Sequence, residues 1–147
     1  MGGNISTEEK LEGFISKLAS LGYRVKEVRR KPQIYSINGE PVNIRCRGKS
    51  RVTADGSRLF WYSVAFSVLR EVNWVIYIAT ESDYFVMLPS NFLNSLKDRM
   101  YPDRSKTETG VFDIDWDSLA IELRQGERIS INEYYHNLKE RECYPRF

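Results

Sequence analysis

Residues 32–47, PQIYSINGEPVNIRCR, decide the fold. Asn38-Gly39 lies near their centre, and this dipeptide is the strongest short-range signal for a tight β-hairpin because both residues tolerate positive φ. The stretch therefore predicts an outgoing strand over 32–37 and a return strand over 41–47.

The return strand has two different faces, because side chains alternate along a strand. One face is apolar and consists of Val42, Ile44 and Cys46. The opposite face is polar and basic, and consists of Asn43, Arg45 and Arg47, with Lys49 continuing it. The strand is thus expected to bury one side and to present cations on the other.

A helix is predicted before the hairpin. Ser6-Thr7-Glu8-Glu9 forms a capping box, in which Ser6 and Glu9 satisfy each other's backbone amides. The apolar residues that follow have helical spacing: Leu11, Phe14, Ile15 and Leu18. Gly22 is expected to end this helix, and Tyr23 to Val28 alternate as a strand does.

Beyond the hairpin, the pattern predicts further strands and short helices. Turns are expected at 54–57 and 125–126, strands at 59–62, 74–79, 84–88, 111–116, 119–123 and 129–131, helices at 91–96 and 132–139, and a polar loop at 101–110. Over 63–70 a strand and a short helix compete, and a helix over 64–71 is favoured. The continuous apolar run at 74–79 indicates a strand buried on both faces. This order predicts one α/β (α+β) domain over 1–147, with helices packed on a central sheet.

Composition excludes several classes of protein. The chain has 147 residues, of which 41% are hydrophobic and 29% charged, as in ordinary globular domains. Two cysteines and one histidine make neither a disulfide framework nor a Cys/His zinc site. We find neither a run of apolar residues long enough for a membrane helix nor a signal peptide, and so expect a soluble, intracellular, cytoplasmic protein without a membrane partner.

The charge is unevenly distributed. Between Arg24 and Arg58, ten basic residues face three acidic ones, a net charge of +7, so the rest of the chain carries −5 of the total of +2. Such asymmetry indicates an anionic partner, although a solvated charged face gives the same pattern. The candidate DNA-binding residues are Arg29, Arg30, Lys31, Arg45, Arg47, Lys49, Arg51 and Arg58.

The element order and three segments resemble the PD-(D/E)xK nuclease superfamily. The segments are the helix end Leu21-Gly22-Tyr23, the hairpin, and an apolar strand followed by a strand that ends in Pro-Ser, which together lie within residues 6–96. The resemblance implies a restriction-endonuclease-like central mixed β-sheet flanked by helices. It also implies an endonuclease of the restriction or homing type that hydrolyses duplex DNA with Mg²⁺.

The family's site residues transfer position by position. Its aspartate corresponds to Gln33, its second carboxylate to Asn43 and its lysine to Arg45, which are the candidate catalytic residues. Glu8 or Glu12 would be an additional acid on the first helix, so the candidate metal ligands are Glu8, Glu12, Gln33 and Asn43. The sequence departs from the family because both carboxylates are amides, which bring no charge to hold a cation, and because Arg cannot act as a base.

Hairpin length decides whether these positions meet. A two-residue loop, Asn38-Gly39, would pair Gln33 with Ile44, whereas a three-residue loop would pair Gln33 with Arg45. The nuclease-like site requires the longer loop or a bulge, and the alternative is an edge hairpin with a solvated basic side.

Three functions stay open: a Mg²⁺-dependent endonuclease acting as a homodimer or homotetramer, a catalytically inert nucleic-acid-binding or protein-interaction module on the same fold, and a small adaptor. Phe60, Trp61 and Tyr62 adjoin the basic region and could stack on bases, but core positions are the favoured interpretation.

Overall fold

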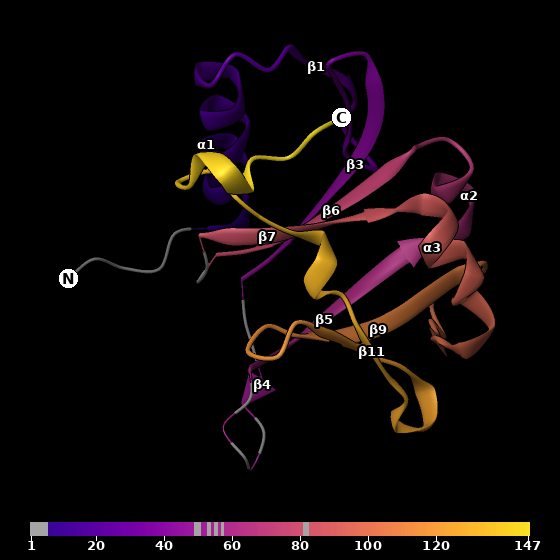
Figure 1. Cartoon of the computed structure of the whole chain (residues 1–147). Helices are drawn as coiled ribbons and strands as arrows, with labels where there is room; N and C mark the ends of the chain where they lie inside the picture. Colours follow the sequence, from indigo (N-terminus) through magenta and orange to yellow (C-terminus); the bar gives the residue numbers. More distant parts are fainter. Residues whose placement is uncertain (1–5, 49–50, 53, 55, 57, 81–82) are drawn as a thin grey trace.

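The computed structural model describes residues 6–48, 51–52, 54, 56, 58–80 and 83–147, without the side chains of 51 and 52. Over these residues the chain has a mixed α+β fold built mainly from two β-sheets (Figure 1). The predicted α+β class is therefore confirmed, whereas the prediction of one central sheet with helices on it is corrected, because the chain forms two sheets. The turn predicted at 54–57 lies partly outside the described residues. Lys49 lies outside them altogether.

The first sheet has six strands in the order β1-β2-β3-β6-β7-β12. Their bounds are Val25–Arg29 (β1), Ile34–Ile37 (β2), Glu40–Arg47 (β3), Trp74–Ala79 (β6), Tyr84–Pro89 (β7) and Tyr135–Asn137 (β12). The pairing of β3 with β6 is parallel and the other pairings are antiparallel. The sheet is thus mixed, with the parallel pair at its centre.

The second sheet has the order β11-β10-β9-β5-β4, and β8 also pairs with β9. Its strands are Arg51–Val52 (β4), Arg58–Ala65 (β5), Tyr101–Pro102 (β8), Thr109–Asp115 (β9), Ala120–Glu122 (β10) and Arg128–Ser130 (β11). Its longest pairing joins β5 to β9 along their length, from Leu59 opposite Asp115 to Ala65 opposite Thr109.

Helices are few and mostly short. They are α1 (Thr7–Ser20), α2 (Phe66–Leu69) and α3 (Ser90–Ser95), with single 3₁₀ turns at Lys97–Arg99, Arg124–Gly126, Asn132–Tyr134 and Arg141–Cys143. The predicted capping box is present, since Ser6 Oγ accepts a hydrogen bond from the Glu9 amide at 3.0 Å. The predicted start of α1 is therefore confirmed.

The first sheet is the middle layer of the molecule. One of its faces packs against α1, where Leu18 and Phe14 contact a cluster that includes Ile44 and Phe85. Its other face packs against the second sheet, in a larger cluster that includes Tyr77. The prediction that 74–79 is a strand buried on both faces is confirmed, because β6 supplies residues to both clusters.

The hairpin has the two-residue loop. Asn38 and Gly39 have φ of 51° and 85°, and Ile37 pairs with Glu40. The Ile44 amide donates to the Gln33 carbonyl oxygen at 3.1 Å, so Gln33 lies opposite Ile44. The alternative of a three-residue loop is wrong, because the left-handed geometry of Asn-Gly closes the tighter turn.

Two predicted helices are strands in part. In place of a helix over 64–71, β5 continues to Ala65 because it pairs with β9, and α2 begins only at Phe66. In place of a helix over 132–139, a 3₁₀ turn leads into β12, which pairs with β7. The loop predicted over 101–110 contains β8 and the start of β9. In each case a non-local strand pairing outweighs the local pattern.

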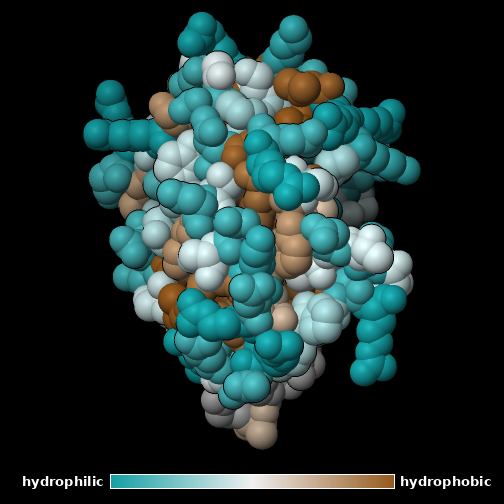
Figure 2. Space-filling model, turned by 90° about the vertical axis from the view of Figure 1, so that its right-hand side faces the viewer, coloured by the Kyte–Doolittle hydropathy of each residue, from teal (hydrophilic) through white to brown (hydrophobic). Residues whose placement is uncertain are grey.

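The outer surface is polar over the face shown in Figure 2, where hydrophilic side chains surround separate hydrophobic areas. Among the helices of the described residues, none combines the length and the apolar composition needed to cross a membrane.

Replacing Leu18 tests the packing of α1 on the sheet. Leu18 is fully buried, so Leu18→Ala is expected to lower the free energy of unfolding by about 3 kcal/mol, through lost apolar contact and the cavity left behind. Urea unfolding measures the change. Ser16→Ala, on the exposed side of the same helix, is the control and should change it by less than about 0.5 kcal/mol. Equal effects would contradict this packing.

Candidate functional site

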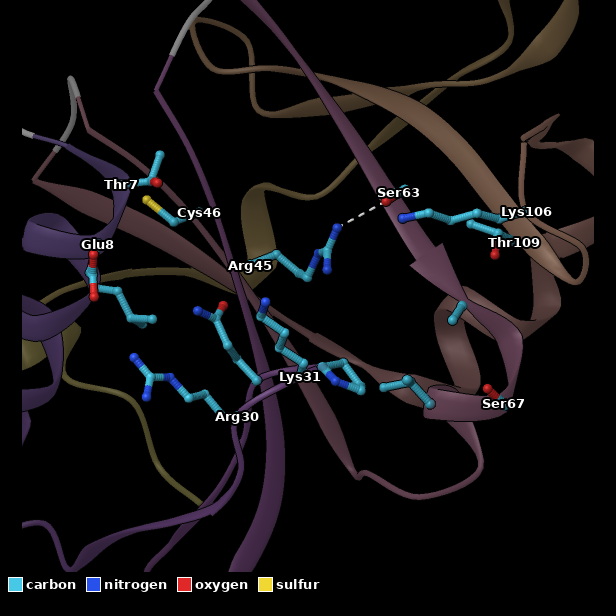
Figure 3. A pocket seen from close by; sticks show the side chains of 15 residues that line it. Thr7, Glu8, Arg30, Lys31, Arg45, Cys46, Ser63, Ser67, Lys106 and Thr109 are labelled. Atoms are coloured by element: carbon cyan, nitrogen blue, oxygen red, sulfur yellow. Dashed lines mark hydrogen bonds between the residues drawn. The ribbon is translucent and has the colours of Figure 1, made fainter. Parts of the chain in front are cut away.

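A cavity of about 600 Å³ opens between the two sheets and α1 (Figure 3). Its wall combines the first turn of α1, the connection between β1 and β2, the distal half of β3, the end of β5, α2, and the segment that joins β8 to β9. Four cationic side chains and one carboxylate line it among the described residues: Arg30, Lys31, Arg45 and Lys106, with Glu8. The cavity is therefore strongly cationic.

Arg45 comes from β3 and points away from α1 toward the second sheet. Its guanidinium donates a hydrogen bond to Ser63 Oγ at 2.9 Å (Figure 3). Tyr77 lies beside Arg45 in the parallel pairing of β3 with β6. Burial raises the pKa of Tyr77, and the neighbouring Arg45 charge opposes that rise. Arg45 is only half-buried, so its remaining donors can reach a ligand in the cavity.

Arg30 and Lys31 come from the turn between β1 and β2, and both are exposed. Lys106 comes from the segment between β8 and β9 and extends toward Ser63 (Figure 3). The cations therefore reach the cavity from two sides. A single anionic group between them would be attracted by every one of them.

Asn43 has a structural position. Its side chain is only 2% exposed, and Nδ2 donates to the Gln33 carbonyl oxygen at 2.8 Å. This bond fixes the start of β2 next to β3. Asn43 is not among the residues that line the cavity, so its amide does not face the space that a substrate would occupy.

The candidate site residues divide into two groups. The structure brings Glu8, Gln33 and Arg45 to one cavity even though the hairpin has the short loop, because the chain leaves the strand geometry at Gln33, before β2 begins at Ile34. Glu12 and Asn43 do not line this cavity. Glu8, Gln33 and Arg45 therefore share one cavity with the two-residue loop, without the longer loop or bulge that the nuclease-like site was expected to require.

The candidate DNA-binding residues separate similarly. Arg30, Lys31 and Arg45 line the cavity, whereas Arg29 and Arg58 form ion pairs with Glu71 at 2.9 Å and with Asp117 at 3.1 Å. Arg47 is exposed at the end of β3, outside the cavity. Lys49 lies outside the described residues, and Arg51 is described only in its backbone. Among the described residues, the cavity wall therefore takes only three of the candidate DNA-binding side chains.

Several lining residues were missed from the sequence. Lys106, Ser63, Ser67 and Thr109 face the cavity with a charge and three hydroxyl groups. Lys106 lies in a segment predicted as a polar loop, and the serines lie in or beside a predicted helix. Their pattern along the chain carries no signal, because only the packing of the second sheet beside β3 brings them together.

The lining does not fit Mg²⁺. Glu8 is the single carboxylate in the described wall of the cavity, and four cations share that wall. Over the described ranges, 6–48 through 83–147 with their gaps, no group of three or more His, Cys, Asp or Glu residues could hold a metal ion. A hard divalent cation requires several oxygen ligands, with carboxylates to balance its charge. The donors present suit an anion instead.

Cys46 lies beside Arg45 in the cavity wall, and burial raises the pKa of its thiol to about 11. It is packed partly against the α1 cluster, as its position on the apolar face predicts. His136 is in β12, away from this cavity, where burial lowers its pKa. The Cys46 thiol is therefore protonated near neutral pH and is not a poised nucleophile.

Comparisons of the chain with protein-family models, curated protein sequences and solved structures find no match.

Alkylation of Cys46 tests the environment of the cavity wall. In a Cys143→Ser variant, Cys46 is the single thiol of the chain. Because the thiolate is the reactive form, the rate of reaction with iodoacetamide is expected to rise with pH toward a midpoint near 11. Circular dichroism checks that the fold persists over this range. A midpoint at the ordinary thiol value of 9.0 would show that Cys46 is solvated, against the structure.

Proposed function

We propose that this chain is a catalytically inert nucleic-acid-binding module, which holds a backbone phosphate of duplex DNA in its cationic cavity. The observation that carries the proposal is the convergence of Arg30, Lys31, Arg45 and Lys106 on one space that contains a single carboxylate. Phosphate groups take bidentate bonds from arginine and point charges from lysine. The hydroxyl groups of Ser63 and Ser67 add neutral donors to the same wall.

The proposed fold type is restriction-endonuclease-like. Three antiparallel strands follow α1, the third of them pairs in parallel with β6, and β7 returns antiparallel before α3. This order is the one that the resemblance to PD-(D/E)xK nucleases implies. The three family positions that share the cavity, Glu8, Gln33 and Arg45, also support it.

A homodimer or homotetramer is part of the proposal. One cavity of about 600 Å³ holds few phosphates, and contacts to few phosphates give weak binding at physiological salt. Two-fold assembly places two cavities on the two strands of a duplex and multiplies the contacts.

Metal-dependent hydrolysis of duplex DNA is the second candidate. It is favoured by the single observation that Glu8 shares the cavity with Gln33 and Arg45. It requires a metal site, and the donors present do not fit one, because an amide and a guanidinium occupy the positions where the family has a carboxylate and a lysine. The binding function is therefore the better supported of the two.

Arg45→Gln is the central test of phosphate binding. Glutamine keeps a donor for Ser63 and removes the charge, so affinity for a DNA duplex should fall by about three- to tenfold. The slope of log affinity against log salt should become shallower by about 0.9, the value for one phosphate contact on B-DNA. Fluorescence anisotropy titrations at several salt concentrations measure both.

Lys26→Ala is the matched control for Arg45→Gln. Lys26 is a basic residue of β1. It lies in the same basic region of the sequence, between Arg24 and Arg58, but it does not line the cavity. The Lys26→Ala variant should keep a DNA affinity and a salt-dependence slope close to those of the parent. DNA binding without salt dependence, or equal losses in both variants, would overturn the role of the cavity.

Chelation separates binding from hydrolysis. The parent protein is expected to leave supercoiled plasmid intact with Mg²⁺ or Mn²⁺, and EDTA is expected to leave its DNA affinity unchanged, because charged side chains rather than a metal contact the phosphate. Agarose gels and anisotropy measure the two properties. Nicking that EDTA abolishes, and that Glu8→Gln removes, would instead establish the hydrolytic candidate.

A further inference from the structure

Trp61 is a large aromatic residue left at the surface of the second sheet. Its neighbours Phe60 and Tyr62 are buried to 0% and 1% exposure, whereas Trp61 is 43% exposed. Among the described residues, Val28 is the other large hydrophobic side chain with comparable exposure. Because strand neighbours point to opposite faces, β5 directs Trp61 away from the core that its neighbours fill.

Tyr101 supports the exposed indole. The two rings have centroids 5.6 Å apart and planes inclined by 40°. Tyr101 is half-buried in β8, where it pairs with Val111 of β9, and Val111 in turn pairs with Ser63 of β5. The pair of rings is thus fixed by three hydrogen-bonded strands rather than by a loop.

The aromatic pair adjoins the cationic cavity through two connections. Trp61 and Ser63 are two residues apart on β5, so their side chains share a face and lie about 7 Å from each other along the strand. Ser63 lines the cavity and accepts a hydrogen bond from Arg45. Tyr101 precedes the segment that carries Lys106 into the same cavity. The indole therefore lies outside the cavity wall, two residues along β5 from Ser63, within reach of the nucleotide next to a phosphate bound in the cavity.

Carboxylates also lie near Trp61 on the second sheet. Arg128 forms ion pairs with two of them, Asp115 at 2.7 Å and Glu122 at 2.9 Å. Asp115 lies on β9, two residues after Asp113, the strand partner of Trp61. Asp113 lies directly opposite Trp61 and is 4% exposed. Trp61 therefore has the cations of the cavity on the Ser63 side and these carboxylates, with Arg128, on the other. An accessible aromatic face beside cations is the combination that binds single-stranded nucleic acid.

We propose that Trp61 stacks on an unpaired base whose neighbouring phosphate lies in the cationic cavity, so that the protein prefers single-stranded DNA to duplex DNA. The inference rests on the proposed nucleic-acid function. Bases inside a duplex already stack on one another and leave no free face for the indole, whereas unpaired bases do. Stacking on an aromatic side chain strengthens binding at each base and tolerates any base sequence.

Paired affinity measurements test the preference. The parent is expected to bind a fluorescent oligothymidylate about tenfold more tightly than a duplex of equal length at the same salt. Trp61→Leu should remove this difference and leave duplex affinity unchanged, while Trp61→Phe should retain part of it. Val28→Ala, which alters the other exposed hydrophobic residue, is the control and should change neither affinity.

The outcomes distinguish the two proposals. If Trp61→Leu binds oligothymidylate as the parent does while Arg45→Gln weakens binding to both ligands, the stacking role is overturned and the cationic cavity stands. If the parent binds neither ligand, the proposed function fails and the stacking role fails with it. Unfolding curves of Trp61→Leu should match those of the parent, because an exposed indole contributes little to the core.

Tryptophan fluorescence gives a second readout. Trp116 is 1% exposed and Trp74 is half-buried, so Trp61 is the accessible one of the three tryptophans. Titration with unlabelled oligothymidylate is expected to quench the emission of the parent, and Trp61→Phe is expected to abolish that change. Quenching that persists in Trp61→Phe would overturn the assignment.

Discussion

The parallel pairing of β3 with β6 is the constraint on which the rest of the structure depends. Parallel neighbours cannot be joined by a tight turn, so the chain must cross over between them. Here the crossover contains β4, β5 and α2, and β5 becomes a central strand of the second sheet. The buried contact of Tyr62 with Tyr77, whose ring centroids are 4.7 Å apart, joins the crossover to β6. The cavity forms where this second sheet passes the distal half of β3.

The net charge of a stretch of sequence does not show which of its cations share one site in the folded protein. The basic region carries a net charge of +7 in the sequence, yet Arg29 and Arg58 are held by carboxylates from other segments. The cavity draws three of its cations from this region and recruits Lys106 from outside it. Surface ion pairs contribute little to stability, but they remove cations from the set that can contact a polyanion. The cations that meet in the cavity therefore indicate an anion-binding site better than the net charge of the basic region does.

Local signals predicted the elements that they control. The capping box and apolar spacing of α1 were predicted correctly, and so were the Asn-Gly hairpin and the buried strand β6. The helix predicted over 132–139 was wrong, because this segment pairs with β7 as β12. The helix predicted over 64–71 is present only as α2, because β5 continues to Ala65 in its pairing with β9. Aromatic residues 60–62 were favoured as core, which is confirmed for Phe60 and Tyr62, while Trp61 is exposed. The prediction is wrong for Trp61 because side chains alternate along β5, so the face opposite Phe60 and Tyr62 lies away from the core.

By itself, the sequence determined the α+β class, the tight hairpin and the presence of Glu8, Gln33 and Arg45 as candidate residues. Capping, turn geometry and side-chain alternation act within a few residues, so they can be predicted without the rest of the chain. Only the tertiary structure decided that Asn43 is buried against Gln33, that Arg45 meets Ser63, and that Lys106 closes the cavity. These contacts join segments far apart in the sequence, and they exist because burying the apolar faces of two sheets against each other fixes which polar side chains share the remaining space.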